Sequence, residues 1–111
     1  MTKCETILES GLTAKGTDYL SVPEIEACLD FIWARRAFIH SMEAFEITKD
    51  YDTANVELSI YGLDGKENWE NHQDVERAQK LVREKLELAK QSSHEIRFNI
   101  WLDWWPAGAI N

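Results

Sequence analysis

The segment EIRFNIWLDW, residues 95–104, decides the fold class, because its apolar and polar side chains alternate without an exception. Strict alternation with a period of two predicts a β-strand with one buried face. A strand of this kind belongs to an antiparallel or mixed sheet rather than to a fully buried parallel one. The predicted inward residues are Ile96, Phe98, Ile100, Leu102 and Trp104, and the outward residues are Glu95, Arg97, Asn99, Trp101 and Asp103.

The same alternation separates the tryptophans near the C-terminus. Trp104 has the inward parity, so we expect it to be largely buried and to anchor the strand in the core. Trp101 has the outward parity, and Trp105 follows at the end of the strand, also on the outward side. Two of the three rings are therefore expected to remain available for contacts outside the core.

A helix is predicted just upstream, in DVERAQKLVREKLELAKQ, residues 74–91. Apolar residues recur there every three or four positions, and Asp74 is well placed to cap the helix. The stripe is expected to pack against the sheet and comprises Val75, Ala78, Val82, Leu86 and Ala89.

Two further strands are predicted at residues 44–49 and 55–62, where the pattern again has a period of two. The turn between them is short, so the two strands should form an antiparallel hairpin. In the first strand, Phe45 and Ile47 share one face. In the second, Val56, Leu58 and Ile60 are expected to face inward.

Two helices are predicted before these strands, each from a capping box: Thr2 with Glu5, and Ser21 with Glu24. The second helix is expected to continue through Met42, because its apolar residues fit helical spacing that far. The chain is therefore predicted to be one small α+β domain, residues 1–111, in the order α-α-β-β-α-β. We expect a three-stranded antiparallel or mixed sheet with the helices packed mainly on one face. The last strand is expected beside the second strand or, preferably, beside the first as its antiparallel neighbour.

The composition is that of a globular protein, with 44% hydrophobic residues and a net charge of −8 over 111 residues. No apolar run approaches the length of a membrane span, and acidic residues occupy the N-terminus, where a signal peptide is apolar. We therefore expect a cytoplasmic protein with no membrane partner. Cys4 and Cys28 are expected to be buried thiols, although such a pair could form a disulfide. The histidines show no ligand spacing, so neither a metal nor a cofactor is expected.

The negative charge is concentrated in the middle of the sequence. Residues 43–76 hold ten acids and two bases and so carry the whole net charge of −8, whereas the rest of the chain has ten of each. This balance argues against direct nucleic-acid binding, which requires a basic surface. It fits either a solvated loop and hairpin or an electrostatic surface that attracts a basic protein.

A second candidate surface is the outward face of the sheet, where tryptophan, tyrosine and arginine side chains are expected together, as in interface hot spots. An open face of this kind would also suit a homodimer. The residues predicted to bind a partner are Glu46, Asp50, Asp52, Glu57, Tyr61, Glu67, Glu70, Trp101 and Trp105. No catalytic motif is present, and the acid–base candidate is His40 with Glu43, three residues further on.

These patterns favour a small acidic binding protein without catalysis. The leading hypothesis is an inhibitor, an immunity-type or phage-type antagonist that mimics nucleic acid and docks on a basic partner such as a nuclease or a nucleic-acid-binding complex. The alternatives are a secretion-type chaperone or dimeric adaptor, and a small enzyme or ligand-binding subunit that uses His40 and Glu43.

Overall fold

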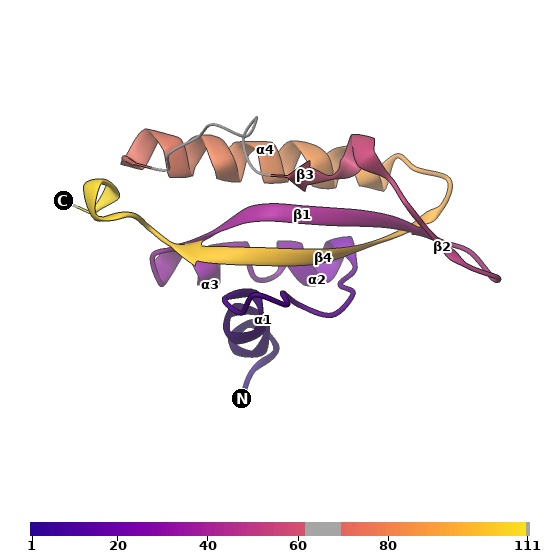
Figure 1. Ribbon diagram of the computed structural model, residues 1–111, viewed down its shortest axis with the longest axis horizontal. Coiled ribbons are helices and arrows are strands. Elements are labelled where there is room, and N and C mark those ends of the chain that lie inside the picture. The colour runs from indigo at the N-terminus through magenta and orange to yellow at the C-terminus, as the bar shows by residue number, and fades with distance from the viewer. Residues whose placement is uncertain (62–69, 111) are drawn as a thin grey trace.

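The computed structural model describes residues 1–61 and 70–110 and is built on one long pair of strands (Figure 1). β1 (Ala37–Ile47) pairs antiparallel with β4 (Glu95–Trp104) from Ala37↔Trp104 to Ile47↔Glu95. The opposite edge of β1 pairs with β2 (Asp52–Ala54) near the end of β1 and with β3 (Ile60–Tyr61) near its middle. β1 is therefore the central strand of a four-stranded antiparallel sheet.

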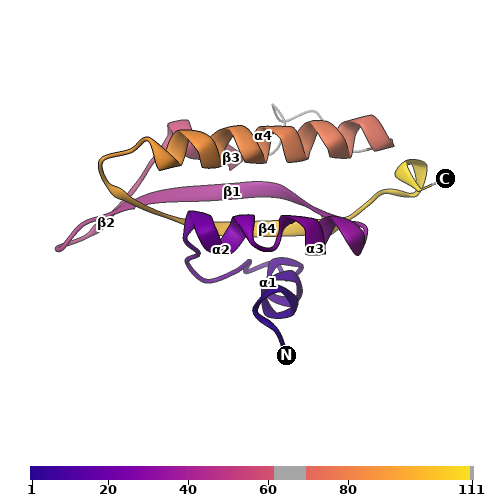
Figure 2. The same ribbon diagram turned by 180° about the vertical axis from the view of Figure 1, so that it is seen from behind.

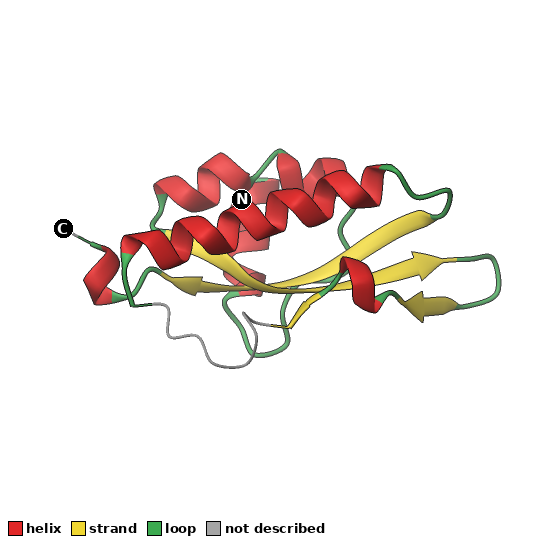
Figure 3. Ribbon diagram, turned by 90° about the horizontal axis from the view of Figure 1, so that it is seen from above, coloured by secondary structure: helices red, strands yellow, loops and turns green. Residues whose placement is uncertain are grey.

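The helices of the described residues are α1 (Lys3–Gly11), α2 (Val22–Glu26), α3 (Leu29–Ala34) and α4 (His72–Lys90), with short 3-10 turns at Val56–Leu58 and Ala107–Ala109. In Figure 2, α2 and α3 lie in front of β4, α4 runs along the other side of β1, and α1 lies beyond α2 and α3. Seen from above, α2, α3 and α4 stand on the same side of the strands (Figure 3). The predicted α+β class and the packing of helices mainly on one face are confirmed. Within the described residues, no helix is both long and apolar enough to span a membrane.

The core forms between this sheet face and the helices. Phe98 and Ile100 of β4 and Met42 and Ala44 of β1 have no exposed surface. They pack with apolar side chains from all the helices, so the alternation of the last strand is the main source of the core. The predicted stripe of α4 is buried throughout, at Val75, Ala78, Val82, Leu86 and Ala89.

The preferred position of the last strand is confirmed, since β4 lies beside β1 and antiparallel to it. The number of strands is corrected from three to four, because the expected hairpin partner is divided. Asn55 accepts a hydrogen bond from the amide of Leu58 through its side chain, which turns the chain into a 3-10 helix. Val56 is consequently 71% exposed rather than inward, whereas Leu58 and Ile60 are buried as predicted.

The second helix is shorter at its C-terminal end than the sequence predicts. Helical structure ends at Ala34, and β1 begins at Ala37, so residues 37–42 are strand and not helix. Arg36 has a φ of 59°, a left-handed conformation that stops a right-handed helix. The apolar run after it fits a buried strand as well as a helix, and the β1–β4 ladder decides between them.

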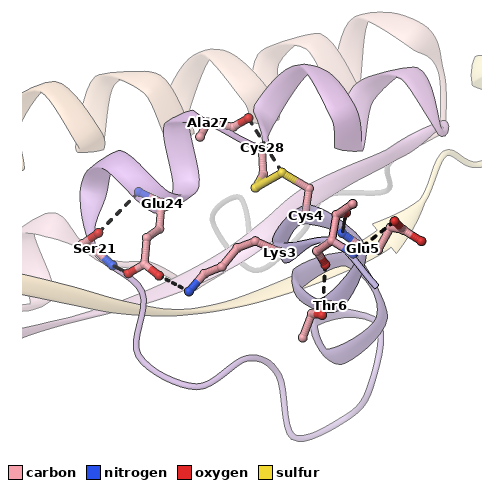
Figure 4. Close-up of a disulfide and its surroundings, with 9 residues drawn as sticks. Lys3, Cys4, Glu5, Thr6, Ser21, Glu24, Ala27 and Cys28 are labelled. Atoms are coloured by element: carbon pink, nitrogen blue, oxygen red, sulfur yellow. Dashed lines mark hydrogen bonds and ion pairs between the residues drawn. A yellow bond between two sulfur atoms is a disulfide. The ribbon is translucent and has the colours of Figure 1, made fainter.

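The N-terminal helix is fastened to α2 and α3 by covalent and polar contacts (Figure 4). Cys4 and Cys28 form a disulfide with their Cα atoms 5.3 Å apart, so the expectation of two free thiols is wrong. Beside it, Lys3 forms an ion pair with Glu24. Hydrogen bonds from Lys3 and from the Ser21 backbone lower the pKa of Glu24 to about 2. Both predicted capping boxes are present.

The burial of the C-terminal tryptophans is the reverse of the sequence prediction. Trp104 is 53% exposed, because the sheet ends there and no described helix covers it. Trp105 instead turns back and packs edge-on to Trp33, with ring centroids 4.5 Å apart, and donates a hydrogen bond from Nε1 to the carbonyl of Ala37. Trp101 is half-buried, and its Nε1 donates to the carbonyl of Ala14.

We expect the disulfide to stabilise the fold, because it closes a loop with a sequence separation of 24 residues in the unfolded chain. Cys4→Ala should lower the free energy of unfolding by about 3 kcal/mol, measured by urea denaturation without reductant. Addition of dithiothreitol should bring the wild type down to the stability of the variant. A wild-type protein whose unfolding curve ignores the reductant would contradict the covalent link.

Burial also sets the expected order of two aromatic substitutions. Phe98→Ala removes a ring with no exposed surface and should cost about 3–5 kcal/mol of unfolding free energy. Trp104→Ala removes a larger but half-exposed ring and should cost less than half as much. Urea denaturation of both variants measures this, and a larger loss for Trp104→Ala would show that this ring lies in the core after all.

Candidate protein-interaction face

The sheet face opposite the helices is the best candidate for a functional surface. Residues directly opposite one another in an antiparallel pair share a face. The register therefore places one set of side chains together, which we call the outer face: Ser41, Glu43, Phe45, Ile47, Asp52, Tyr61, Glu95, Arg97, Asn99 and Trp101. Each of them is half-buried or exposed, and no helix of the described residues packs on them.

The segment that precedes α2 frames this face along the free edge of β4. Thr17 and Leu20 form backbone hydrogen bonds with Ile100 and Phe98, so residues 17–20 act almost as a further strand. Gly16 has a φ of 76° and lies against the ring of Trp101, where a side chain would collide with the indole. The edge of the sheet is thereby covered, and Trp101 is held by the hydrogen bond to Ala14.

Aromatic rings form the centre of the outer face. Tyr19, which lies in residues 17–20 at the edge of the sheet, reaches across β4 to Phe45 of β1, with ring centroids 5.2 Å apart. Tyr19 is 40% exposed and Tyr61 is 58% exposed. Rings held against a rigid sheet offer contact area at a low cost in side-chain entropy.

Carboxylates surround these rings. Glu43, Asp52 and Glu95 lie on the outer face, whereas Arg97 is its one basic residue. Arg97 is already engaged, with Nε 3.1 Å from Glu95 and a terminal nitrogen 3.6 Å from Glu24. The face is therefore negative as well as aromatic. A hollow of about 330 Å³ lies among Tyr19, Ile47, Asp52, Glu95 and Arg97.

Burial and the negative charge of the outer face both affect the pKa of the Tyr19 phenol. Burial raises its pKa above the ordinary value of 10.0, and the hydrogen bond to Asp52 and the charges of Asp52 and Glu43 raise it further. Both effects disfavour the phenolate, because that charge would be desolvated and would lie beside like charges.

The structure brings only part of the predicted partner-binding set together. Asp52, Tyr61 and Trp101 lie on the outer face. Glu46 does not, because it lies opposite the buried Ile96, and it contacts His94 with its carboxylate 3.4 Å away. Trp105 is packed among other rings, and Glu67 lies outside the described residues.

The remaining acids are exposed but spread along the molecule. Asp50 lies in the turn of the β1–β2 hairpin, and Glu70 lies just before α4. This turn and the N-terminus of α4 are at opposite ends of the molecule (Figure 1). Glu57 lies in the 3-10 turn, where Lys85 donates to its carbonyl. The acidic third of the sequence is therefore not one compact surface.

The sequence prediction does not find Phe45 on the outer face or Tyr19 beside it, and it gives Glu95 the outward parity without including it among the partner-binding residues. The short predicted strand places Phe45 on its apolar side. The strand in fact begins at Ala37, and its buried face includes Met42 and Ala44. Phe45 therefore lies on the opposite face. A continuous reading of AFIHSMEAFEI as one strand could have found this. Tyr19 had no such signal, because its position depends on pairing with β4.

His40 and Glu43 are not brought into contact. His40 lies at a bulge in β1, and its Nδ1 is 2.8 Å from Ser41 Oγ. Burial lowers the pKa of His40, and the charge of Asp103 partly opposes this. In the described part of the chain, no hydrogen bond or ion pair joins His40 to Glu43. Residues 1–61 and 70–110 also contain no cluster of side chains that could hold a metal ion.

Comparison with known proteins finds no matching family model, no similar curated sequence and no similar solved structure.

We expect Asp52→Asn to lower the pKa of Tyr19 toward 10.0, because it removes the neighbouring charge while leaving the larger effect of burial in place. Titration of the Tyr19 ring carbons by NMR measures this. Tyr61→Phe is a useful control, since it simplifies the spectrum without touching the Tyr19 contacts. If Asp52→Asn left the titration of Tyr19 unchanged, the two side chains would not be neighbours.

Proposed function

We propose that this protein is a small binding protein that uses the outer face to dock on a basic surface of a partner protein. One observation carries the proposal: Glu43, Asp52 and Glu95 surround the Tyr19–Phe45 pair, while Arg97 is already paired with carboxylates. Aromatic anchors with a charged rim are the usual arrangement of an interaction surface. The carboxylates would steer association, and the rings would hold the complex.

The biological role that we favour is inhibition of a nucleic-acid-processing protein. Proteins that bind nucleic acid carry basic surfaces, because phosphate contacts dominate their affinity. An acidic chain with a net charge of −8 that occupied such a surface would exclude the nucleic acid. An immunity-type or phage-type antagonist of a nuclease acts in this way, without a catalytic site and without touching nucleic acid itself.

The other hypotheses gain less support from the outer face. A homodimeric chaperone or adaptor that paired two outer faces would bring like charges together, which opposes association. An enzyme that used His40 and Glu43 would need a rearrangement to bring the two side chains into contact. The cytoplasmic location stays a prediction, and the disulfide favours an oxidising compartment instead, since cytosolic thiols are kept reduced.

The test is affinity capture from the source cells with two charge-matched variants of the protein. Glu43→Lys/Asp52→Lys reverses two charges on the outer face. Glu9→Lys/Glu84→Lys reverses two exposed charges on α1 and α4 and changes the net charge by the same amount. We expect the wild type and the α1/α4 variant to retain a basic protein that the outer-face variant loses.

Kinetics with the purified partner complete the test. The outer-face variant should associate more slowly by on the order of tenfold, and added salt should reduce this difference. The partner should lose nucleic-acid binding or cleavage when wild-type protein is added. Equal capture by both variants would remove the outer face as the binding surface, and a partner that stayed active in the complex would refute inhibition.

A further inference from the structure

A pocket between α3 and α4 lies on the helix side of the molecule, away from the outer face. α3 stands beside the N-terminal half of α4 there (Figure 2). The pocket has a volume of about 390 Å³ and is lined by Asp30 and Trp33 from α3 and by Glu76, Gln79, Lys80 and Arg83 from α4. The spacing of these residues places each group on one side of its helix.

Gln79 gives this pocket its chemical interest. The residue is only 4% exposed, and its Nε2 has no hydrogen-bond partner. A buried amide that donates to nothing is uncommon, because it has lost its hydrogen bonds to water without replacement. Gln79 lines the pocket, but its Nε2 has almost no accessible surface, so an acceptor in the pocket reaches this nitrogen only when the side chain rotates.

The charged residues of the pocket are also unpaired, apart from Glu76. Glu76 forms an ion pair with His72, at 2.8 Å. Asp30, Lys80 and Arg83 form no ion pair among the residues that the structure describes. The pocket thus presents two free cations on the α4 wall and a free carboxylate on the α3 wall.

Trp33 supplies an aromatic surface whose position is fixed. Its ring packs edge-on to Trp105 at 4.5 Å and to His72 at 5.9 Å between centroids. Aromatic rings prefer such edge-to-face and offset contacts, so the part of the ring that lines the pocket could receive one more planar group.

We propose that this pocket binds a small zwitterion of the amino-acid type with an aromatic side chain. Its carboxylate would accept hydrogen bonds from Arg83 and Lys80 and, once the Gln79 side chain rotates to bring its buried Nε2 to the pocket, from that amide as well, since a carboxylate offers about four acceptor sites. Its ammonium group would pair with Asp30, and its ring would pack on Trp33. The inference is independent of the proposed function, because it involves none of the outer-face residues.

The experiment follows the Gln79 side-chain amide in ¹H–¹⁵N NMR spectra during titration with L-phenylalanine. We expect a saturable shift of this signal, with a dissociation constant of about 0.1–1 mM for a ligand of this size. Phenethylamine and 3-phenylpropionate each lack one of the two charges and should bind at least about tenfold more weakly. No saturable shift, or equal binding of 3-phenylpropionate, would overturn the proposal.

Substitutions provide a second, independent readout. Followed at the backbone amide of Lys80, which every one of these variants keeps, Gln79→Leu and Arg83→Gln should abolish the L-phenylalanine titration, whereas Arg77→Gln, on a cation that lies 3.7 Å from Asp74 outside the pocket, should leave it unchanged. Without ligand, Gln79→Leu should raise the melting temperature, because it replaces an unpaired buried amide with an apolar group. A lower melting temperature would mean that the amide already has a structural role, which would contradict a site that awaits a ligand.

Discussion

The pairing of β1 with β4 is the interaction on which the rest of the structure depends. The two strands run together for their whole length, and one face of the pair supplies the most deeply buried side chains, among them Met42, Phe98 and Ile100. The helices all contribute to that core, so their positions follow from the register of the two strands. The same register determines which residues form the outer face, because successive side chains of a strand point to opposite faces of the sheet.

The two candidate sites use the two sides of this arrangement. The outer face is a surface of rings and carboxylates whose border is set by residues 17–20 on the edge of β4. The pocket lies between helices and contains the unpaired amide of Gln79. The first suits a protein partner and the second a small molecule, because a broad face buries a large area whereas a pocket encloses a ligand. The core between them lets each be altered without touching the other.

The parts of the fold that the sequence predicts are those with local patterns. Alternation identifies β4, helical spacing identifies α4, and capping boxes mark the starts of α1 and α2. The prediction fails where distant contacts decide. Residues 37–42 fit a helix until β4 is placed beside them, and Trp104 has a buried parity but lies beyond the helices that would cover it. The disulfide and the unpaired Gln79 likewise depend on how separate helices pack, which spacing along one chain does not show.

The measurement that tests the account most directly is the set of Hα–Hα nuclear Overhauser effects across the β1–β4 pair. Phe98 forms its backbone hydrogen bonds with Leu20, and the carbonyl of Ala44 accepts from Asn55, so Ala44 and Phe98 face each other without a mutual hydrogen bond. Such pairs bring their Cα atoms to about 4.5 Å and give strong effects. We predict these effects for Ala44–Phe98 and for Met42–Ile100. Their absence, together with sequential amide–amide effects typical of a helix through residues 37–42, would contradict the central strand and with it the outer face.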